Sequence, residues 1–105
     1  MAVEEFTIRA EESAPGQAVV WLSGNLNAAA IERLDNAFTE LFKYEVYKIV
    51  VDLSELYQIS SAGIGSLLNA YSTVQENNGF LKVRGASNRI LESFSLVGFT
   101  PELEK

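Results

Sequence analysis

The sequence of 105 residues contains no cysteine and no histidine. Without cysteine, disulfide bonds and thiol catalysis are excluded, and without either residue the chain lacks the usual ligands of zinc and copper. Carboxylates alone could still bind Mg²⁺ or Ca²⁺. The lack of histidine also removes the usual general base of a serine hydrolase triad. We therefore expect no metal ion, no cofactor and no catalytic residues.

Basic residues and long apolar runs are also scarce. The chain has 8 Lys and Arg against 14 Asp and Glu, a net charge of −6, whereas a nucleic-acid partner requires clustered basic residues. A basic protein surface is the better electrostatic match. No apolar run approaches the roughly 18 residues of a membrane span, and the opening MAVEEFTIRA does not resemble a signal peptide. We expect no nucleic acid or membrane partner and a cytoplasmic location.

Length and composition indicate one soluble globular domain. The chain is 48% hydrophobic and 21% charged, and domains typically have about 100–200 residues. No internal repeat or linker interrupts it. We expect a single domain over residues 1–105, with a core from about residue 3 to 100 and a polar, irregular tail at 101–105.

Four segments have the patterns of strands. Alternation around Phe6 and Ile8 predicts a half-buried strand, and residues 18–24 (AVVWLSG) predict a second. The pair Pro15–Gly16 between them predicts a turn, and hence a hairpin. The continuous apolar run within residues 47–56 predicts a central strand buried on both faces. Residues 80–86 predict the fourth strand.

Three other segments repeat apolar residues every three or four positions, as amphipathic helices do. The apolar positions are Ile31, Leu34, Phe38, Leu41 and Phe42; Ile64, Leu67, Leu68, Tyr71 and Val74; and Ile90, Leu91, Phe94 and Val97. Asn27 and Ser87 fit N-caps of the first and third helix. The order of elements predicts a small α/β domain, with a mixed, mostly parallel sheet of about four strands, an N-terminal hairpin and three helices covering the sheet.

The stretch YQISSAGIGSLL, from Tyr57 to Leu68, joins the central strand to the second helix. Sites in such sheets form beyond the carboxyl ends of the strands, and a helix N-terminus favours an anion or a phosphorylated serine. Gly63 and Gly65 would let another backbone approach closely. The alternative is that Ser60 or Ser61 only caps the helix. Neither the Gly-Lys-Ser/Thr ending of a P-loop nor a Gly-x-Ser-x-Gly elbow is present.

Other polar or aromatic candidates are better explained by structure than by chemistry. Asp52 and Glu55 could form a carboxylate pair, but an aspartate at a strand end usually accepts hydrogen bonds from nearby backbone N–H groups. Trp21 lies in a strand and fits packing better than ligand binding. Lys82 and Arg84 alternate with apolar residues, which favours the solvent side of a strand.

Several runs of the sequence, taken in order, resemble one family. The segments KIVVDLSELYQISSAGIGSLLNAY (48–71), NNGFLKVRGASNRILESFSLVGF (77–99) and WLSGNLNAAAIERL (21–34) are similar to the STAS domains of bacterial anti-sigma factor antagonists. The resemblance covers about residues 3–100. It implies partner switching: the unphosphorylated domain binds an anti-sigma factor that is a serine kinase of the histidine-kinase-like ATPase type. Phosphorylation of a serine at the start of the second helix breaks the complex, and a serine phosphatase restores it.

The switch loop of this chain departs from the family pattern. The family loop typically reads Asp-Ser-Ser-Gly, with the second serine phosphorylated. Aligning its glycine with Gly63 puts Ser60 at the aspartate, Ser61 at the first serine and Ala62 at the acceptor. An upstream Gly-Glu-Leu-Asp pattern likewise puts Asn27 at its aspartate. We therefore favour Ser61, and then Ser60, as phosphorylation candidates; the alternative is a constitutive binder in which neither is phosphorylated.

The resemblance also implies a partner-binding surface at the loop and the start of the second helix. Its residues are Ser60, Ser61, Ala62, Gly63, Ile64, Gly65 and Asn27, with Ile59 and Asn69 as further candidates; Ile64 fits a core position equally well. Two other functions stay open: a small-ligand domain that senses an anion or a nucleotide, and a scaffold in a signalling complex. An enzyme has the least support.

Overall fold

A computed structural model of the chain describes residues 5–104, so the expected start of the core at residue 3 lies outside the described residues. The elements, in chain order, are β1 (Thr7–Ala14), β2 (Gln17–Leu26), the 3-10 turn η1 (Ala28–Ala30), α1 (Ile31–Lys43), β3 (Lys48–Ile59), α2 (Ser61–Glu76), β4 (Phe80–Arg84), α3 (Asn88–Leu96) and β5 (Glu102–Leu103).

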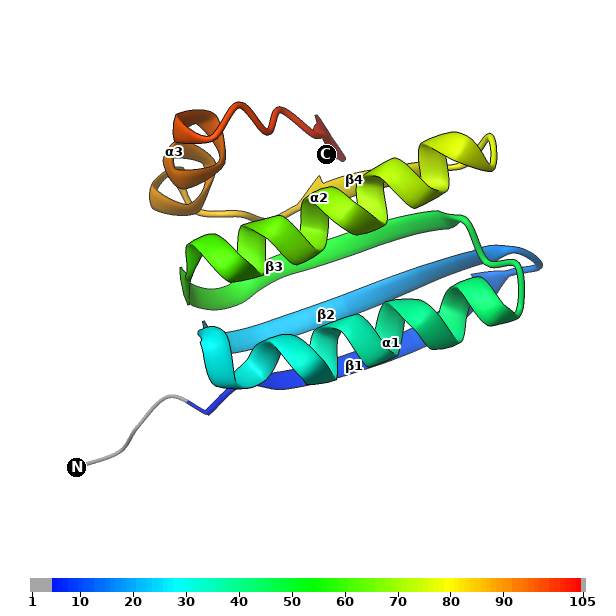
Figure 1. The fold of residues 1–105 in the computed structure, drawn as a ribbon, viewed down its shortest axis with the longest axis horizontal. Helices are drawn as coiled ribbons and strands as arrows, with labels where there is room; N and C mark the ends of the chain where they lie inside the picture. The colour runs from blue at the N-terminus through cyan, green and yellow to red at the C-terminus, as the bar shows by residue number, and fades with distance from the viewer. Residues whose placement is uncertain (1–4, 105) are drawn as a thin grey trace.

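The strands form one sheet in the order β1-β2-β3-β4-β5 (Figure 1). β1 and β2 are antiparallel and are joined by the turn at Pro15–Gly16. The pairs β2–β3, β3–β4 and β4–β5 are parallel. The predicted α/β class, the N-terminal hairpin and the mixed, mostly parallel sheet are therefore confirmed.

Within the expected irregular tail, Glu102–Leu103 form a strand, so the sheet has five strands where about four were expected. Glu102 and Leu103 pair with Lys82 and Val83 of β4, and the Glu104 N–H donates to the Val83 carbonyl at 2.9 Å. The Lys82 ammonium lies 3.4 Å from a Glu102 carboxylate oxygen. A strand of two residues is too short to show alternation, and its pairing depends on β4 more than on its own sequence.

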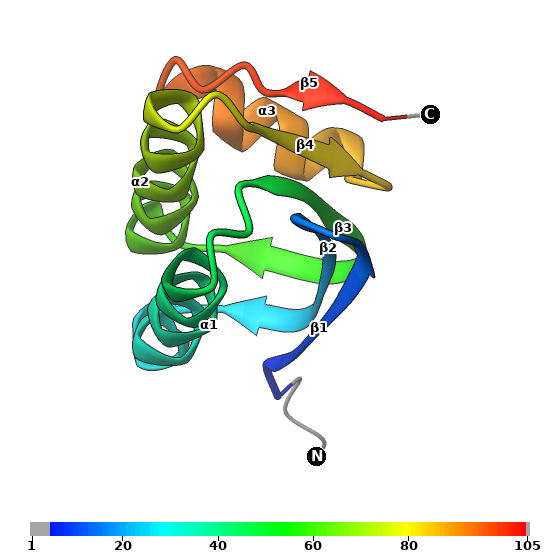
Figure 2. The same cartoon turned by 90° about the vertical axis from the view of Figure 1, so that its right-hand side faces the viewer.

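Helices α1 and α2 lie side by side over one face of the sheet, and α3 lies beyond the carboxyl end of β4 (Figures 1 and 2). The predicted apolar faces supply the core. From the helices, the buried residues among those predicted are Leu34 and Phe38, Ile64, Leu67 and Val74, and Ile90 and Phe94. The three periodic segments are thus helices whose apolar stripes pack inward.

Val97 does not belong to the buried face of α3. It is 52% exposed, because α3 ends at Leu96 and the following Gly98, at φ +77°, turns the chain away from the helix. Phe99 takes the buried place instead and packs edge-on against Phe94, with ring centroids 5.0 Å apart. Helical spacing could not place Val97 correctly, since the left-handed turn breaks the period at that point.

Candidate functional site

The site expected between β3 and α2 lies at the carboxyl edge of the sheet, but it contains almost no loop. β3 continues to Ile59 and α2 begins at Ser61, so Ser60 alone joins them. The Ser60 N–H donates to the carbonyl oxygen of Leu26 on the neighbouring parallel strand at 2.9 Å. Most of the segment predicted as a loop is therefore strand or the first turn of α2 (residues 61–65), and backbone pairing holds its start in place.

Ser60 is the N-cap of α2. Its backbone is extended, and its hydroxyl oxygen accepts a hydrogen bond from the Gly63 N–H at 3.1 Å. The capping interpretation is confirmed for Ser60 and not for Ser61, which is the first helical residue. The half-buried Ser60 hydroxyl thus satisfies a backbone donor that the helix leaves unpaired.

Loss of the Ser60 cap has a measurable cost. Ser60→Ala is expected to lower the free energy of unfolding by about 1 kcal/mol, measured by urea denaturation. Ser60→Asp is expected to recover most of that loss, because a carboxylate also caps a helix and favours its N-terminus. Ser61→Ala serves as the matched control within about 0.5 kcal/mol of the wild type. Equal losses at both serines would contradict the assignment of the cap.

Ser61 and Ala62 are exposed at the first turn of α2. Ser61 makes no side-chain hydrogen bond to any residue in the described part of the chain. Its hydroxyl therefore projects from the positive end of α2 with free access to solvent. Of the two serine candidates, Ser61 alone has a hydroxyl that is not engaged in capping.

Gly63 and Ile64 face inward and do not lie on the surface. A Cβ built on Gly63 would lie 2.8 Å from Leu26 Cγ and 2.9 Å from Ile59 Cγ1, so the chain's own side chains fill the space that we assigned to a partner. Ile64 is a core residue, 4% exposed. At Gly65, by contrast, a Cβ would have no neighbour within 4 Å. Of the two glycines, Gly65 alone leaves room for close approach by another backbone.

Asn27 lies beside the site. We predicted it as the N-cap of α1, but it does not cap that helix. It precedes η1 and makes no side-chain capping bond. Its backbone carbonyl oxygen accepts a hydrogen bond from the Ala30 N–H at 3.0 Å. Ala30 is the residue that precedes α1. Asn27 and Ser60 nevertheless border the same surface hollow of about 400 Å³. The 3-10 turn displaces the helix start by three residues, which a sequence pattern does not reveal.

Two residues that sequence reasoning missed border this hollow: Tyr57 and Arg89. Tyr57 is on β3 and is 59% exposed. Arg89 comes from the exposed first turn of α3. Ile59 is half-buried and borders the same hollow, whereas Asn69 is exposed farther along α2 and borders another hollow, between α1 and α2. An aromatic residue beside polar Gln58 near a strand end could have indicated Tyr57 from the sequence. No sequence feature indicated Arg89.

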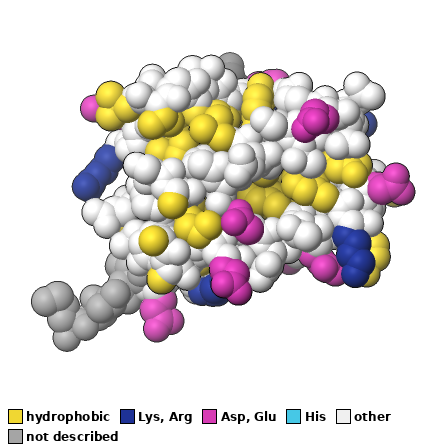
Figure 3. Space-filling view, viewed as in Figure 1, with side chains coloured by type: hydrophobic (Ala, Val, Ile, Leu, Met, Phe, Trp, Pro, Cys, Tyr) yellow, Lys and Arg dark blue, Asp and Glu magenta, His cyan; other side chains and the backbone are white. Residues whose placement is uncertain are grey.

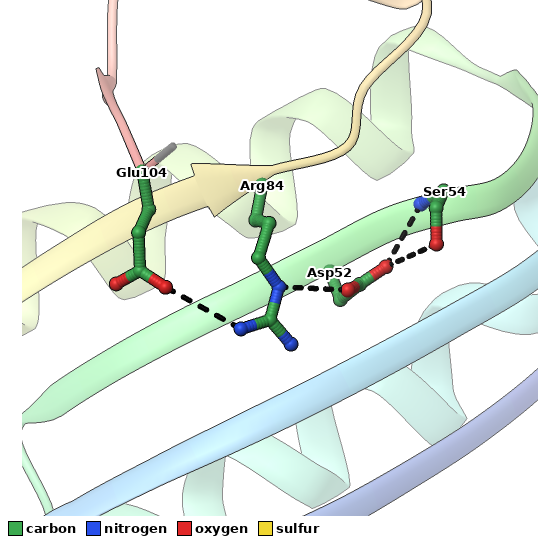
Figure 4. Close-up of polar contacts among 4 residues, drawn as sticks. All are labelled: Asp52, Ser54, Arg84 and Glu104. Carbon is green, nitrogen blue, oxygen red and sulfur yellow. Dashed lines mark hydrogen bonds and ion pairs between the residues drawn. The ribbon is translucent and has the colours of Figure 1, made fainter.

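Asp52 belongs to a structural ion-pair cluster. Its carboxylate accepts hydrogen bonds from the Ser54 N–H at 2.9 Å and from Arg84 Nε at 2.8 Å, and Arg84 Nη1 donates to Glu104 at 3.3 Å (Figure 4). The backbone bond from Ser54 agrees with our interpretation of Asp52, but Asp52 lies within β3 and not at a strand end as expected. Arg84, whose side chain is 33% exposed, lies between the two carboxylates and does not simply face solvent.

The cluster sets the ionisation of its members. Burial raises the pKa of the Asp52 carboxyl, but hydrogen bonds from Ser54 and Arg84 and the charge of Arg84 outweigh it, so its pKa lies below the ordinary value of 3.8. The hydrogen bond to Asp52, in turn, raises the pKa of Arg84. A carboxylate held ionised in this way is a poor general acid or base near neutral pH.

The cluster gives stability a pH dependence. Asp52→Asn is expected to lower the free energy of unfolding by about 1.5 kcal/mol near pH 7. Because the pKa of Asp52 is depressed in the folded chain, its contribution is complete above the unfolded pKa of about 4 and is lost as pH falls through the folded pKa. Urea denaturation from pH 7 to pH 2 should therefore show the two stabilities converging below about pH 4. Glu40→Gln, at an exposed position of α1, is the control. A difference in the free energy of unfolding between wild type and Asp52→Asn that stays constant down to pH 2 would contradict the prediction.

The remaining candidates have packing roles. The Arg9 guanidinium lies 4.2 Å from the ring centroid of half-buried Trp21, an arrangement typical of cation–π packing. Among residues 5–104, no group of three acidic side chains could hold a metal ion. In the same range, no helix is long and apolar enough to cross a bilayer.

Fold and site together define a small α/β domain with a neutral, hydroxyl-bearing helix start exposed at the carboxyl edge of its sheet. A family model described as "Mlab, STAS domain" matches residues 10–103. The chain therefore belongs to the STAS domain family, as its sequence patterns indicated. A comparison with curated proteins gave no significant match.

Solved structures share the fold. The anti-sigma factor antagonist SpoIIAA in its unphosphorylated form matches with a TM-score of 0.80 at 21% identity, over 94% of this chain and 88% of that one. The Bacillus cell fate determinant SpoIIAA in its phosphorylated form matches with 0.79 at 20%, over 93% and 89%. An anti-sigma factor antagonist from Mycobacterium paratuberculosis matches with 0.77 at 22%, over 99% and 90%. At these identities the likeness shows the fold.

Proposed function

We propose that this protein is a non-enzymatic regulatory module of the anti-sigma factor antagonist type. Its partner is a serine kinase of the histidine-kinase-like ATPase type that also acts as an anti-sigma factor, called the switch kinase below. The kinase docks on the first turn of α2 and its surroundings. Phosphorylation of Ser61 releases the complex, and a serine phosphatase restores the binding form. Membership of the STAS family and the shared fold of anti-sigma factor antagonists support this role.

The observation that carries the proposal is the division of labour between the two serines. The Ser60 hydroxyl caps α2, whereas the Ser61 hydroxyl is exposed and free of side-chain hydrogen bonds within the described residues. A kinase requires an accessible hydroxyl, so Ser61 is the better acceptor although Ala62 takes the usual acceptor position. Phosphate there would also lie at the positive end of the α2 dipole.

The composition of α2 supports a protein interface. From Ser61 to Gln75 the helix contains no charged residue, although charged residues make up 21% of the chain. On the face that α1 and α2 form, charged side chains lie mainly over α1 and at the margins (Figure 3). Interface cores are depleted in charge, so α2 has the composition expected of a docking helix.

Added charge would switch such a surface without refolding it. A phosphoserine carries nearly two negative charges, which an exposed helix start tolerates but a closely packed interface does not. SpoIIAA in its two forms matches this chain with TM-scores of 0.80 and 0.79. The phosphorylated form thus keeps the fold, which agrees with a switch that does not unfold the domain.

The test combines the purified protein with ATP and a purified histidine-kinase-like ATPase from the same genome, followed by mass spectrometry. Phosphate is expected on Ser61 of the wild type and of Ser60→Ala, and on neither serine of Ser61→Ala. Phosphate on Ser60 instead would overturn the choice of acceptor. Its absence from both serines would remove the switch, and failure to form any complex would remove the partner.

A further inference from the structure

Tyr57 is a large aromatic side chain with no evident structural reason to be exposed. It is 59% exposed on β3, three residues before the N-cap of α2, and its hydroxyl makes no hydrogen bond within the described residues. The flanking apolar residues Leu56 and Ile59 are buried and half-buried. An exposed aromatic ring beside a binding site is a common feature of interfaces, where tyrosine is enriched.

The Tyr57 side chain borders two hollows of different charge. On one side, a hollow of about 400 Å³ also contains Ser60 and Arg89 in its wall. On the other, a hollow of about 340 Å³ is lined by Glu5 and Glu55, which both carry carboxylates. Neither carboxylate forms an ion pair with another described residue. The surface around the ring is therefore acidic on one side, where unpaired charge is available to a partner.

We propose, on the basis of the function proposed above, that Tyr57 is the aromatic anchor of the switch-kinase interface and that Glu55 and Glu5 receive a basic side chain of the kinase. The interface thus extends from the first turn of α2 around the end of β3. It is continuous with the start of α2, because Tyr57 and Ser60, the N-cap that precedes Ser61, share a hollow. The matching kinase surface has an apolar recess for the ring and a Lys or Arg beside it.

The two parts of this surface have different effects on binding. A tyrosine ring removes a large apolar area from water at a small entropic cost, so Tyr57 contributes mainly to the lifetime of the complex. The carboxylates are exposed at the rim, where charges mainly raise the association rate and make it depend on salt. The net charge of −6 favours a basic partner surface in the same way.

Four variants test the inference by surface plasmon resonance with the same histidine-kinase-like ATPase. Tyr57→Ala is expected to lower affinity about tenfold or more, and Tyr57→Phe to stay within about threefold. Tyr44, 68% exposed at the end of α1, is the matched aromatic control, and Tyr44→Ala should leave affinity within about twofold. Glu55→Gln should slow association about threefold at low salt and flatten its salt dependence.

The outcomes separate this inference from the proposed function. Wild-type binding that Tyr57→Ala leaves unchanged overturns the anchor while the proposed function stands. An equal loss for Tyr44→Ala and Tyr57→Ala overturns it as well, because the effect is then not local. Absence of binding by the wild type removes the proposed function and this inference together. Thermal denaturation of each variant shows whether it is folded, and exposed Tyr57 is expected to tolerate substitution.

Discussion

Ser61→Asp is expected to weaken binding of the switch kinase about 100-fold or more, measured by isothermal titration calorimetry. The substitution puts a permanent negative charge on the exposed first residue of α2. In a closely packed interface at the neutral start of α2, that charge loses its hydration without gaining an opposite charge. Ser61→Ala keeps the surface neutral and small, so it should bind as the wild type does while resisting phosphorylation.

Stability provides the internal control for this result. A carboxylate at a helix N-terminus interacts favourably with the helix dipole, so Ser61→Asp should be as stable as the wild type or slightly more stable. Lost binding therefore cannot be attributed to unfolding. Ser13→Asp places the same charge at an exposed position beside the β1–β2 turn, at the opposite edge of the sheet, and should leave affinity within about twofold. Undiminished binding by Ser61→Asp would refute the charge switch.

Patterns that repeat over many residues predicted most of the fold. The alternation around Phe6 and Ile8, and the apolar run at residues 49–51, correctly indicated β1 and β3. The three helical faces placed Leu34, Phe94 and their neighbours in the core. In each case several residues carried the same signal, and an apolar stripe is stable only when it is buried against another element.

Features that depend on one or two residues, or on distant parts of the chain, could not be predicted. β5 forms because Glu102 and Leu103 pair with the edge of β4. Likewise, the alternating pattern around Arg84 favoured the solvent side of a strand. Its partner Asp52 lies 32 residues away in the sequence, so no local pattern could indicate this ion pair. Each of these is a tertiary effect that local periodicity does not contain.

The two glycines of the first turn of α2 also looked alike in the sequence, and the structure separates them. Gly63→Val is expected to lower the free energy of unfolding by about 3 kcal/mol, measured by urea denaturation. Even a Cβ at Gly63 would lie within 3.0 Å of Leu26 and Ile59 atoms. Leu26 is fully buried, so its side chain cannot move aside without disturbing the core. Strain there shifts the start of α2 and should weaken kinase binding as a secondary result.

Gly65→Val, in the same turn, is expected to behave in the opposite way. A Cβ at Gly65 has no neighbour within 4 Å, and valine is a better helix former than glycine, so stability should stay within about 0.5 kcal/mol of the wild type. Kinase affinity should fall about tenfold, because the added side chain occupies space that the partner approaches. If both variants lose stability equally, the packing assigned to Gly63 is wrong. If Gly65→Val binds normally, no backbone of the kinase comes close to Gly65, and the proposed close approach at this turn is wrong.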